Sequence, residues 1–299
     1  MTASALATRE KTRVAVSSVV AAIGLTVLKI TVGLMTGSLG ILSEAAHSAL
    51  DLVAAAATVF AVKASAKPAD DDHPYGHGKI ESLSALFETS LLLLTCAWII
   101  WEAIQRLFFH QVHVEASYWA FSVIALSILV DISRSRALMK VAKKYQSQAL
   151  EADALHFSTD VWSSSVVLVG LGLVALADKL RQPWLIRADA IAALSVAGIV
   201  IWVSLKLGKK SLDDLMDAIP KGLTLRAREA VLLVPGVEEA PKIRMRRIGG
   251  DWFSDVVITI QPGLSAEEAH TIADAVESAL KPLMPGGDVV VHVEPREST

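Results

Sequence analysis

The sequence predicts a six-helix transmembrane α-bundle followed by a cytoplasmic α+β domain with the ferredoxin-like order αββαβ. Three observations support this prediction. The 299 residues are 53% hydrophobic, with a mean hydropathy of +0.48, which is too apolar for an ordinary soluble domain. Six apolar stretches are each long enough to cross a bilayer, which takes about 20 residues. After Lys210 the composition becomes that of a soluble domain, so we expect a membrane domain over 1–210 and a second domain over 211–299.

The six spans are expected near 13–34, 39–62, 84–108, 116–137, 154–177 and 185–206. A short turn around Thr36, Gly37 and Ser38 separates the first two, which should be antiparallel neighbours. The first apolar run is long and has no small-residue cleavage site behind it, so we interpret it as a retained helix and not as a signal peptide. The single cysteine, Cys96, excludes a disulfide framework.

Basic residues gather on one side of the predicted spans, at the N-terminus, in two loops and after the last span. They are Arg9, Lys11, Arg13, Lys63, Lys67, Lys79, Arg134, Arg136, Lys140, Lys143, Lys144, Lys206, Lys209 and Lys210. The opposite side carries fewer, namely Arg106, Lys179, Arg181 and Arg187. The positive-inside rule therefore predicts a multi-pass protein of the bacterial inner membrane with both termini in the cytoplasm. The net charge of −3 gives no support for nucleic-acid binding.

The second domain shows local signals for five elements. An amphipathic helix is expected over 223–234, ended by Pro235 and Gly236. Strand-like alternation follows over 241–248 and 252–261, joined by a Gly-Gly-Asp hairpin turn. Ser265 and Glu268 form a capping-box pattern before a helix over 266–281, and a last strand is expected over 287–293.

Two His-x-x-x-Asp pairs lie inside apolar helices, His47 with Asp51 and His156 with Asp160. Residues four apart share one helix face, so each pair offers an imidazole and a carboxylate in the same direction. Two facing pairs would supply two nitrogens and two oxygens, a set suited to Zn²⁺ or a similar dication. Helix–helix hydrogen bonds are the alternative. Buried carboxylates without a cation are costly, which favours an intramembrane metal site. Glu44 lies one turn off this face and is not included as a ligand.

Two further clusters leave a choice between metal binding and ordinary surface polarity. In the segment 70–79 (DDDHPYGHGK), glycines allow a tight turn in which Asp70, His73 and His77 can converge on one ion. A solvated acidic turn is the other interpretation. The second domain carries Asp255 on its middle strand, His270 on its last helix, and His292 with Glu294 on one face of its last strand. This set is either a metal site or a group of unrelated surface residues.

Motifs of enzymes and ATP-driven pumps are absent from the sequence. There is no His-Glu-x-x-His and no Gly-x-x-x-x-Gly-Lys-Ser/Thr. No nucleophile–base set or open zinc site with a Glu base is evident either. We therefore expect neither a catalytic nor a cofactor-binding site.

The segments SEAAHSALD (43–51), HPYGHGKIE (73–81) and HFSTD (156–160), with six spans and a C-terminal αββαβ domain, resemble the cation diffusion facilitator family over nearly the whole chain. The resemblance implies a homodimer in the lipid bilayer that exports divalent metal ions from the cytoplasm in exchange for protons. It implies a transport site at the two His-x-x-x-Asp pairs, and members with His and Asp in both helices resemble zinc transporters. It also implies a second metal site in the 70–77 loop.

The same resemblance implies an inter-subunit salt bridge from Lys79 to an acid beyond the last span, with three candidates, Asp213, Asp214 and Asp217. In the second domain, Pro241 and Val257 stand where members with two zinc ions have additional histidines. A full binuclear site is therefore not expected. A single, weaker site at the dimer interface is expected instead, built from Asp255, His270 and His292.

The expected function is efflux of a divalent cation, with Zn²⁺ as cargo, by proton antiport and alternating access around a midplane site. Metal ions and protons compete for the same four side chains, and free imidazole titrates near pH 6.5. Fe²⁺, Co²⁺ or Cd²⁺ are alternative cargoes, whereas Mg²⁺ and Ca²⁺ prefer all-oxygen shells. A non-transporting metal sensor that only dimerises is the alternative from another class.

Overall fold

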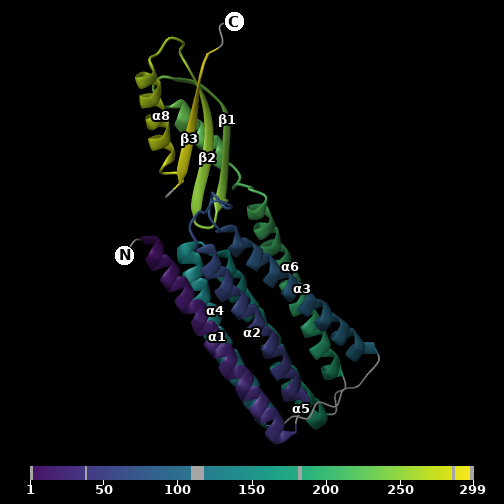
Figure 1. Cartoon of the computed structure of the whole chain (residues 1–299). Coiled ribbons are helices and arrows are strands. Elements are labelled where there is room, and N and C mark those ends of the chain that lie inside the picture. Colours follow the sequence, from purple (N-terminus) through teal and green to yellow (C-terminus); the bar gives the residue numbers. More distant parts are fainter. Residues whose placement is uncertain (1–2, 38, 109–117, 181–183, 285–286, 297–299) are drawn as a thin grey trace. The chain divides into compact units, whose positions relative to one another are not determined.

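The computed structural model describes residues 3–37, 39–108, 118–180, 184–284 and 287–296. Its first six elements are the long helices α1 (Ala3–Thr36), α2 (Leu39–Ser65), α3 (Lys79–Phe108), α4 (Tyr118–Tyr145), α5 (Gln148–Leu180) and α6 (Trp184–Leu215). They run alongside one another as a bundle (Figure 1). The chain divides into two compact units, Met1–Lys67 with Ile80–Ser211 and Pro68–Lys79 with Leu212–Thr299. The segment between α2 and α3 therefore belongs to the second unit.

The helices are longer than the hydrocarbon layer they would cross. With 34 residues, α1 is about 51 Å long, whereas the hydrocarbon core of a bilayer is about 30 Å thick. By length and composition, three described segments qualify as spans, namely Ala5–Thr36, Glu44–Ser65 and Lys79–Trp98. The prediction that the residues between the fourth and fifth spans form a loop is wrong. α4 continues to Tyr145 and α5 begins at Gln148, so only two residues separate the helices. The basic residues assigned to that loop lie on α4.

The bundle is held by small and apolar side chains. α1 packs on α2 and α4, and α5 packs on α4 and α2. One core cluster combines Phe157, Leu138 and Leu150 with small residues such as Ala55 and Ala154, which let membrane helices approach closely. We call the end of the bundle at Gly37 the α1–α2 end and the opposite end the α2–α3 end. The side chains of Arg106, Lys179, Arg181 and Arg187 lie outside the described residues.

The second unit contains α7 (Leu223–Leu232), β1 (Val237–Ile248), β2 (Asp251–Ile260), α8 (Ala266–Leu280) and β3 (Asp288–Pro295). The strands form one sheet in the order β1-β2-β3, with β1 antiparallel and β3 parallel to β2. Buried side chains of β2 alternate, and α7 and α8 pack with them into one core. The predicted order αββαβ is confirmed. The capping box is confirmed as well, because Ser265 accepts from the Glu268 N–H and Glu268 accepts from the Ser265 N–H.

Candidate metal centres

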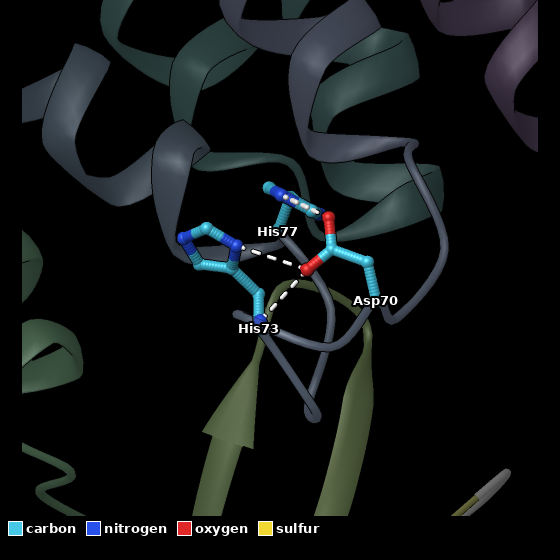
Figure 2. A group of neighbouring side chains, drawn as sticks. All are labelled: Asp70, His73 and His77. Atoms are coloured by element: carbon cyan, nitrogen blue, oxygen red, sulfur yellow. Dashed lines mark hydrogen bonds and ion pairs between the residues drawn. The ribbon is translucent and has the colours of Figure 1, made fainter.

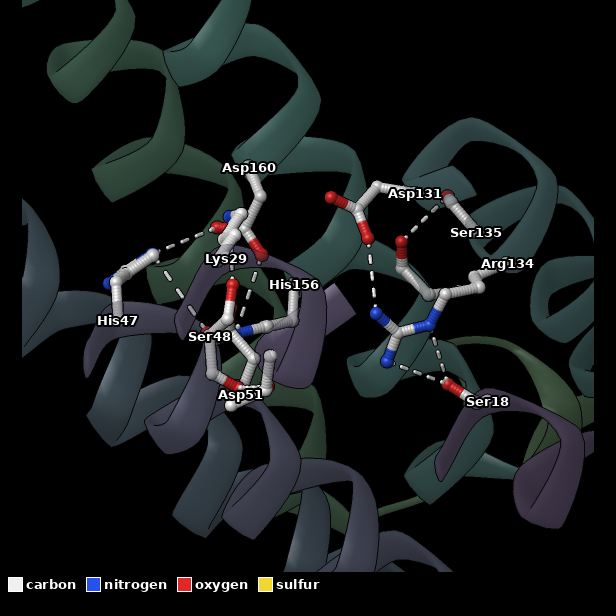
Figure 3. A network of polar contacts seen from close by, with 12 residues as sticks. Ser18, Lys29, His47, Ser48, Asp51, Asp131, Arg134, Ser135, His156 and Asp160 are labelled. Carbon is white, nitrogen blue, oxygen red and sulfur yellow. Dashed lines mark hydrogen bonds and ion pairs between the residues drawn. The ribbon is translucent and has the colours of Figure 1, made fainter. Parts of the chain in front are cut away.

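The structure brings the two intramembrane His-x-x-x-Asp pairs together (Figure 3). We call His47, Asp51, His156 and Asp160 the quartet. Nε2 of His156 lies 3.2 Å from Asp51 Oδ1 and 3.6 Å from Asp160 Oδ2. Nε2 of His47 lies 3.9 Å from Asp51 Oδ1 and 3.9 Å from Asp160 Oδ1. Each imidazole from one helix thus faces carboxylates from both α2 and α5.

These separations suit a small dication. Ligand atoms placed tetrahedrally at zinc–nitrogen and zinc–oxygen distances would lie about 3.3 Å from one another. The ligand atoms of His47, Asp51 and Asp160 all lie within 4.8 Å of one another, and His156 adds a second nitrogen. Asp160 Oδ2 is buried without a hydrogen-bond partner among the described residues, so it has lone pairs for a cation. The quartet can therefore offer an N₂O₂ set to a metal ion with little rearrangement.

A cavity of about 210 Å³ reaches the quartet from one side. His47 and Asp160 line it together with Glu44, Thr95 and Ser163. These lining residues lie level with the quartet or on its α1–α2 side. The His47 side chain is 40% exposed, whereas the Asp51 and His156 residues are 9% and 4% exposed. The protein therefore covers the quartet least on the α1–α2 side of the bundle.

A buried lysine beside the quartet was missed by the sequence analysis. Lys29 of α1 is 4% exposed, and its Nζ lies 3.2 Å from Glu44 Oε2 and 2.8 Å from Ser48 Oγ. Glu44 thus has a cationic partner, in agreement with its exclusion from the ligand set. A lone lysine in the otherwise apolar span 13–34 was the available signal.

Arg134 of α4 was assigned to a loop by the sequence analysis but is buried in the bundle. It donates to Asp131 Oδ1 at 3.0 Å and to Ser18 Oγ of α1 at 3.2 Å and 3.1 Å (Figure 3). Its guanidinium carbon lies 3.5 Å from the centroid of the Phe157 ring of α5. Arg134 therefore links α1, α4 and α5, and its contact on α5 is the residue that follows His156.

The loop residues Asp70, His73 and His77 converge as well, in the second unit (Figure 2). Asp70 Oδ1 lies 3.1 Å from His73 Nδ1, and Asp70 Oδ2 lies 3.4 Å from His77 Nε2. His77 Nδ1 lies 3.3 Å from the Pro68 carbonyl oxygen, which can only accept. Nδ1 of His77 therefore carries the proton, and Nε2 is left free for a metal.

Backbone contacts shape this loop before any metal binds. The His73 N–H donates to Asp70 Oδ1 at 2.7 Å, and this hydrogen bond holds the pKa of the Asp70 carboxyl below its usual range. Gly76 has φ of +79° and donates its N–H to the His73 carbonyl. Tyr75 packs edge-to-face on Phe253, with ring centroids 5.1 Å apart, and lies under the Arg246 guanidinium at 3.7 Å. The loop is thereby anchored to β1 and β2.

Comparison with known proteins assigns nearly the whole chain to known protein domains. Residues 15–216 match the family described as "Cation efflux transmembrane domain", and residues 223–296 match "Cation efflux protein, cytoplasmic domain". The chain belongs to the cation diffusion facilitator family. It is 31% identical to the cation-efflux pump FieF of Salmonella arizonae and 32% identical to that of Salmonella newport. Each match extends over 288 residues and covers 95% of this chain and 92% of the relative.

Solved structures of MamM CTD variants are similar to about a quarter of this chain. The nickel form of one is 30% identical, covers 26% of this chain and 100% of its own, and has a TM-score of 0.25. The cadmium form of another is 31% identical, covers 26% of this chain and 98% of its own, and has a TM-score of 0.24.

Membership of the cation diffusion facilitator family makes this protein a membrane transporter that exports divalent metal ions, and not an enzyme.

In this exporter the acid that pairs with Lys79 is Asp217. Lys79 Nζ lies 2.8 Å from Asp217 Oδ1 and donates to the Leu215 carbonyl at 3.2 Å. The pair forms within one chain, whereas the resemblance implies a bridge between subunits, and a bridge to a second chain stays a prediction. Asp217 lies just past the end of α6 with φ of +59°, so the chain turns there and brings the carboxylate back to Lys79.

The cytoplasmic-domain residues of this exporter are not gathered in one chain. Asp255 pairs with Arg244 at 3.3 Å, His270 with Asp274 at 3.7 Å, and His292 with Glu294 at 3.4 Å. Asp255 and His292 alternate with core residues of β2 and β3, so they lie on the sheet face away from α7 and α8, whereas His270 is on α8. A site that uses all of them would need a second chain, and it stays a prediction.

Proposed function

We propose that this exporter carries Zn²⁺ by preference, out of the cytoplasm and in exchange for protons. The observation that supports the cargo best is the set of four distances, 3.2 to 3.9 Å, between the two imidazole nitrogens and the two carboxylates of the quartet. Nitrogen and carboxylate donors in a compact arrangement favour Zn²⁺ over Mg²⁺ and Ca²⁺. Fe²⁺, Co²⁺ and Cd²⁺ also accept this donor set, so they are the competing cargoes.

Proton exchange follows from the chemistry of the same four side chains. A metal ion binds neutral imidazoles and ionised carboxylates, so each ligand that holds a proton must release it before coordination. A dication that leaves the quartet is replaced in charge by two protons, one on each imidazole. Because free imidazole titrates near pH 6.5, this exchange takes place within the working range of a cell.

Orientation and assembly complete the proposal. Exposed basic residues of α4, including Arg136, Lys140, Lys143 and Lys144, lie toward the α2–α3 end of the bundle. The positive-inside rule then puts this end and both termini in the cytoplasm of a cell with the protein in its inner membrane. The cavity beside His47 would then face outward. Two copies would associate through the domain over 211–299, and metal in the 70–77 loop or between those domains would report the cytoplasmic metal level.

Metal flux into proteoliposomes with an imposed pH gradient tests the proposal. Wild type should move Zn²⁺ faster than Fe²⁺, Co²⁺ or Cd²⁺, and a pH-sensitive dye should record proton counterflow. Asp160→Ala should abolish flux, whereas Asp288→Ala, which removes an exposed carboxylate at the start of β3, should not. Normal Zn²⁺ flux in Asp160→Ala would refute the quartet as transport site. Metal flux without proton movement would refute antiport, and a different order of metals would reassign the cargo.

A further inference from the structure

Glu88 of α3 and Asp153 of α5 form a second group of acids in the bundle, outside the quartet. Both residues are 0% exposed. Asp153 and Thr58, which contacts Glu88, lie two helical turns (about 10 Å) from Asp160 and Asp51, toward the α2–α3 end. Near this level Ala85 of α3, Ala152 of α5 and Leu207 of α6 belong to one core cluster.

Three of their four oxygens have no hydrogen-bond partner among the described residues. Thr58 Oγ1 donates to Glu88 Oε1, but Glu88 Oε2 and both oxygens of Asp153 are without partners. An ionised carboxylate in such a place is so unfavourable that the group neutralises instead. Two carboxyls that are both fully buried, with three oxygens that accept no hydrogen bond, are therefore not expected to be ionised at the same time.

The charged and titratable groups around this pair do not supply the missing cation. They are Asp51 of α2, Arg134 of α4, and His156 and Asp160 of α5. The Arg134 guanidinium attracts Asp153, but its N–H groups donate to Asp131 and Ser18. The histidine and the other two aspartates belong to the quartet and serve the transported ion.

A balance of charges over the described helices also leaves Glu88 and Asp153 without a cation. Lys29 offsets Glu44, Arg134 offsets Asp131, and a dication in the quartet offsets Asp51 and Asp160. Two protons on the imidazoles offset the same carboxylates when the dication is absent. In both states the acids left over are Glu88 and Asp153. One proton on either acid would leave a single negative charge on the pair, and on Asp153 that charge would be attracted by Arg134.

We propose that Glu88 and Asp153 together hold at least one proton and form a second proton-binding site, distinct from the quartet, whose occupation is required for the α2–α3 end of the bundle to close. When this end is sealed, at least one of the two carboxyls carries a proton and is neutral. When the end opens, water reaches the pair, the proton passes to water, and two ionised carboxylates attract a dication toward the quartet. On closure the pair takes a proton back from the same side.

This site rests on the proposed transport function, but it makes a separate prediction. Because its proton returns to the side from which it came, the net number of protons exchanged per metal ion does not depend on it. Its effect is on the rate of closure. At high pH the pair cannot recover its proton, so transport should slow by up to about tenfold per pH unit, even without a pH gradient.

The test uses full-length protein in proteoliposomes with equal pH on both sides and a Zn²⁺ gradient as the only driving force. Wild type should show the alkaline decline in rate. Glu88→Gln, which mimics the protonated acid, should lose that decline, and Glu88→Asp should restore it. Infrared spectra at neutral pH should show a protonated carboxyl band that is lost or shifted in Glu88→Gln and Asp153→Asn. Glu81→Gln is the matched control, because buried Glu81 already has Lys11 as a cationic partner at 2.5 Å.

The outcomes separate the two proposals. Absence of Zn²⁺ flux in wild type would refute the transport function, while the infrared band would still decide whether the pair holds a proton. Flux with the same alkaline decline in wild type and Glu88→Gln would overturn the closing role of the site. A carboxyl band unchanged in both Glu88→Gln and Asp153→Asn would overturn the proton-binding site itself.

Discussion

Removal of the Arg134 guanidinium should be among the most damaging single changes to the bundle. Arg134 is 7% exposed and Asp131 is 9% exposed, so Arg134→Met leaves a buried carboxylate without its partner. Breaking a buried ion pair from one side costs about 3–5 kcal/mol. For a unit of this size each kcal/mol lowers the unfolding temperature by about 2–4 °C, so a fall of about 6–20 °C is expected. Loss of the contact with the Phe157 ring adds to the effect.

The assay is thermal unfolding in detergent, followed by tryptophan fluorescence at one fixed scan rate, since unfolding of such proteins is often irreversible. Arg136→Met is the matched control on an exposed position of the same helix, and it should stay within about 2 °C of wild type. The double variant Arg134→Met/Asp131→Leu should recover most of the loss, because no unpaired charge remains. The reasoning fails if the single variant matches the control or if the double variant falls as far as the single one.

Three further predictions concern the second unit. Gly78→Ala would place a Cβ 2.8 Å from the Gly249 nitrogen, so it should push the 70–77 loop away from the β1–β2 hairpin. Zn²⁺ binding at Asp70 should then weaken by about 10–100-fold. An unchanged Zn²⁺ affinity in calorimetry would contradict this prediction. The lowered pKa of Asp70 means that its hydrogen bond to the His73 N–H is present above the ordinary Asp pKa and is lost as pH falls through the lowered value. Amide exchange at His73 should show this loss of protection, and protection that persists in Asp70→Ala, which has no side-chain acceptor, would refute it. Ser265→Ala removes the helix cap at a cost of about 1 kcal/mol, so the transition of this unit should fall by about 4–8 °C, and a shift below about 1 °C would count against the cap.

Local chemistry made the second unit predictable. The capping box at Ser265, the Gly249-Gly250 turn and the period-two pattern of β2 are each encoded within a few neighbouring residues. The start of β1 was placed four residues late, because Pro241 cannot donate a ladder hydrogen bond. β1 tolerates it as an edge strand, with register shifts before Lys242 that let the strand begin at Val237.

The quartet was predictable in part. The spacing of four residues fixes each His and Asp on one face of its own helix, and this much follows from α-helix geometry. That the face on α2 meets the face on α5 depends on packing between distant segments. The expectation that these two faces meet came from the resemblance to the family. The distances from His156 to Asp51 and from His47 to Asp160 agree with that expectation.

The buried charges were missed for one physical reason. Hydropathy averaged over a span marks the hydrocarbon layer, and it records neither where a helix ends nor where one charged side chain points. Arg134 was therefore assigned to a loop, and Lys29, Glu88 and Asp153 were passed over. Each lies inside a long helix with its polar atoms turned toward the bundle interior.

The most direct test of the central claim is X-ray absorption at the zinc edge on protein carrying one equivalent of Zn²⁺. The loop ligands are removed by Asp70→Asn, His73→Ala and His77→Ala, and the histidines of the predicted cytoplasmic-domain site by His270→Ala and His292→Ala. We predict four ligands, two imidazole nitrogens and two carboxylate oxygens, at about 2.0–2.2 Å. Adding His47→Ala and His156→Ala should remove the imidazole signal. A shell of water oxygens alone, or an imidazole signal that survives without these two histidines, would contradict the account.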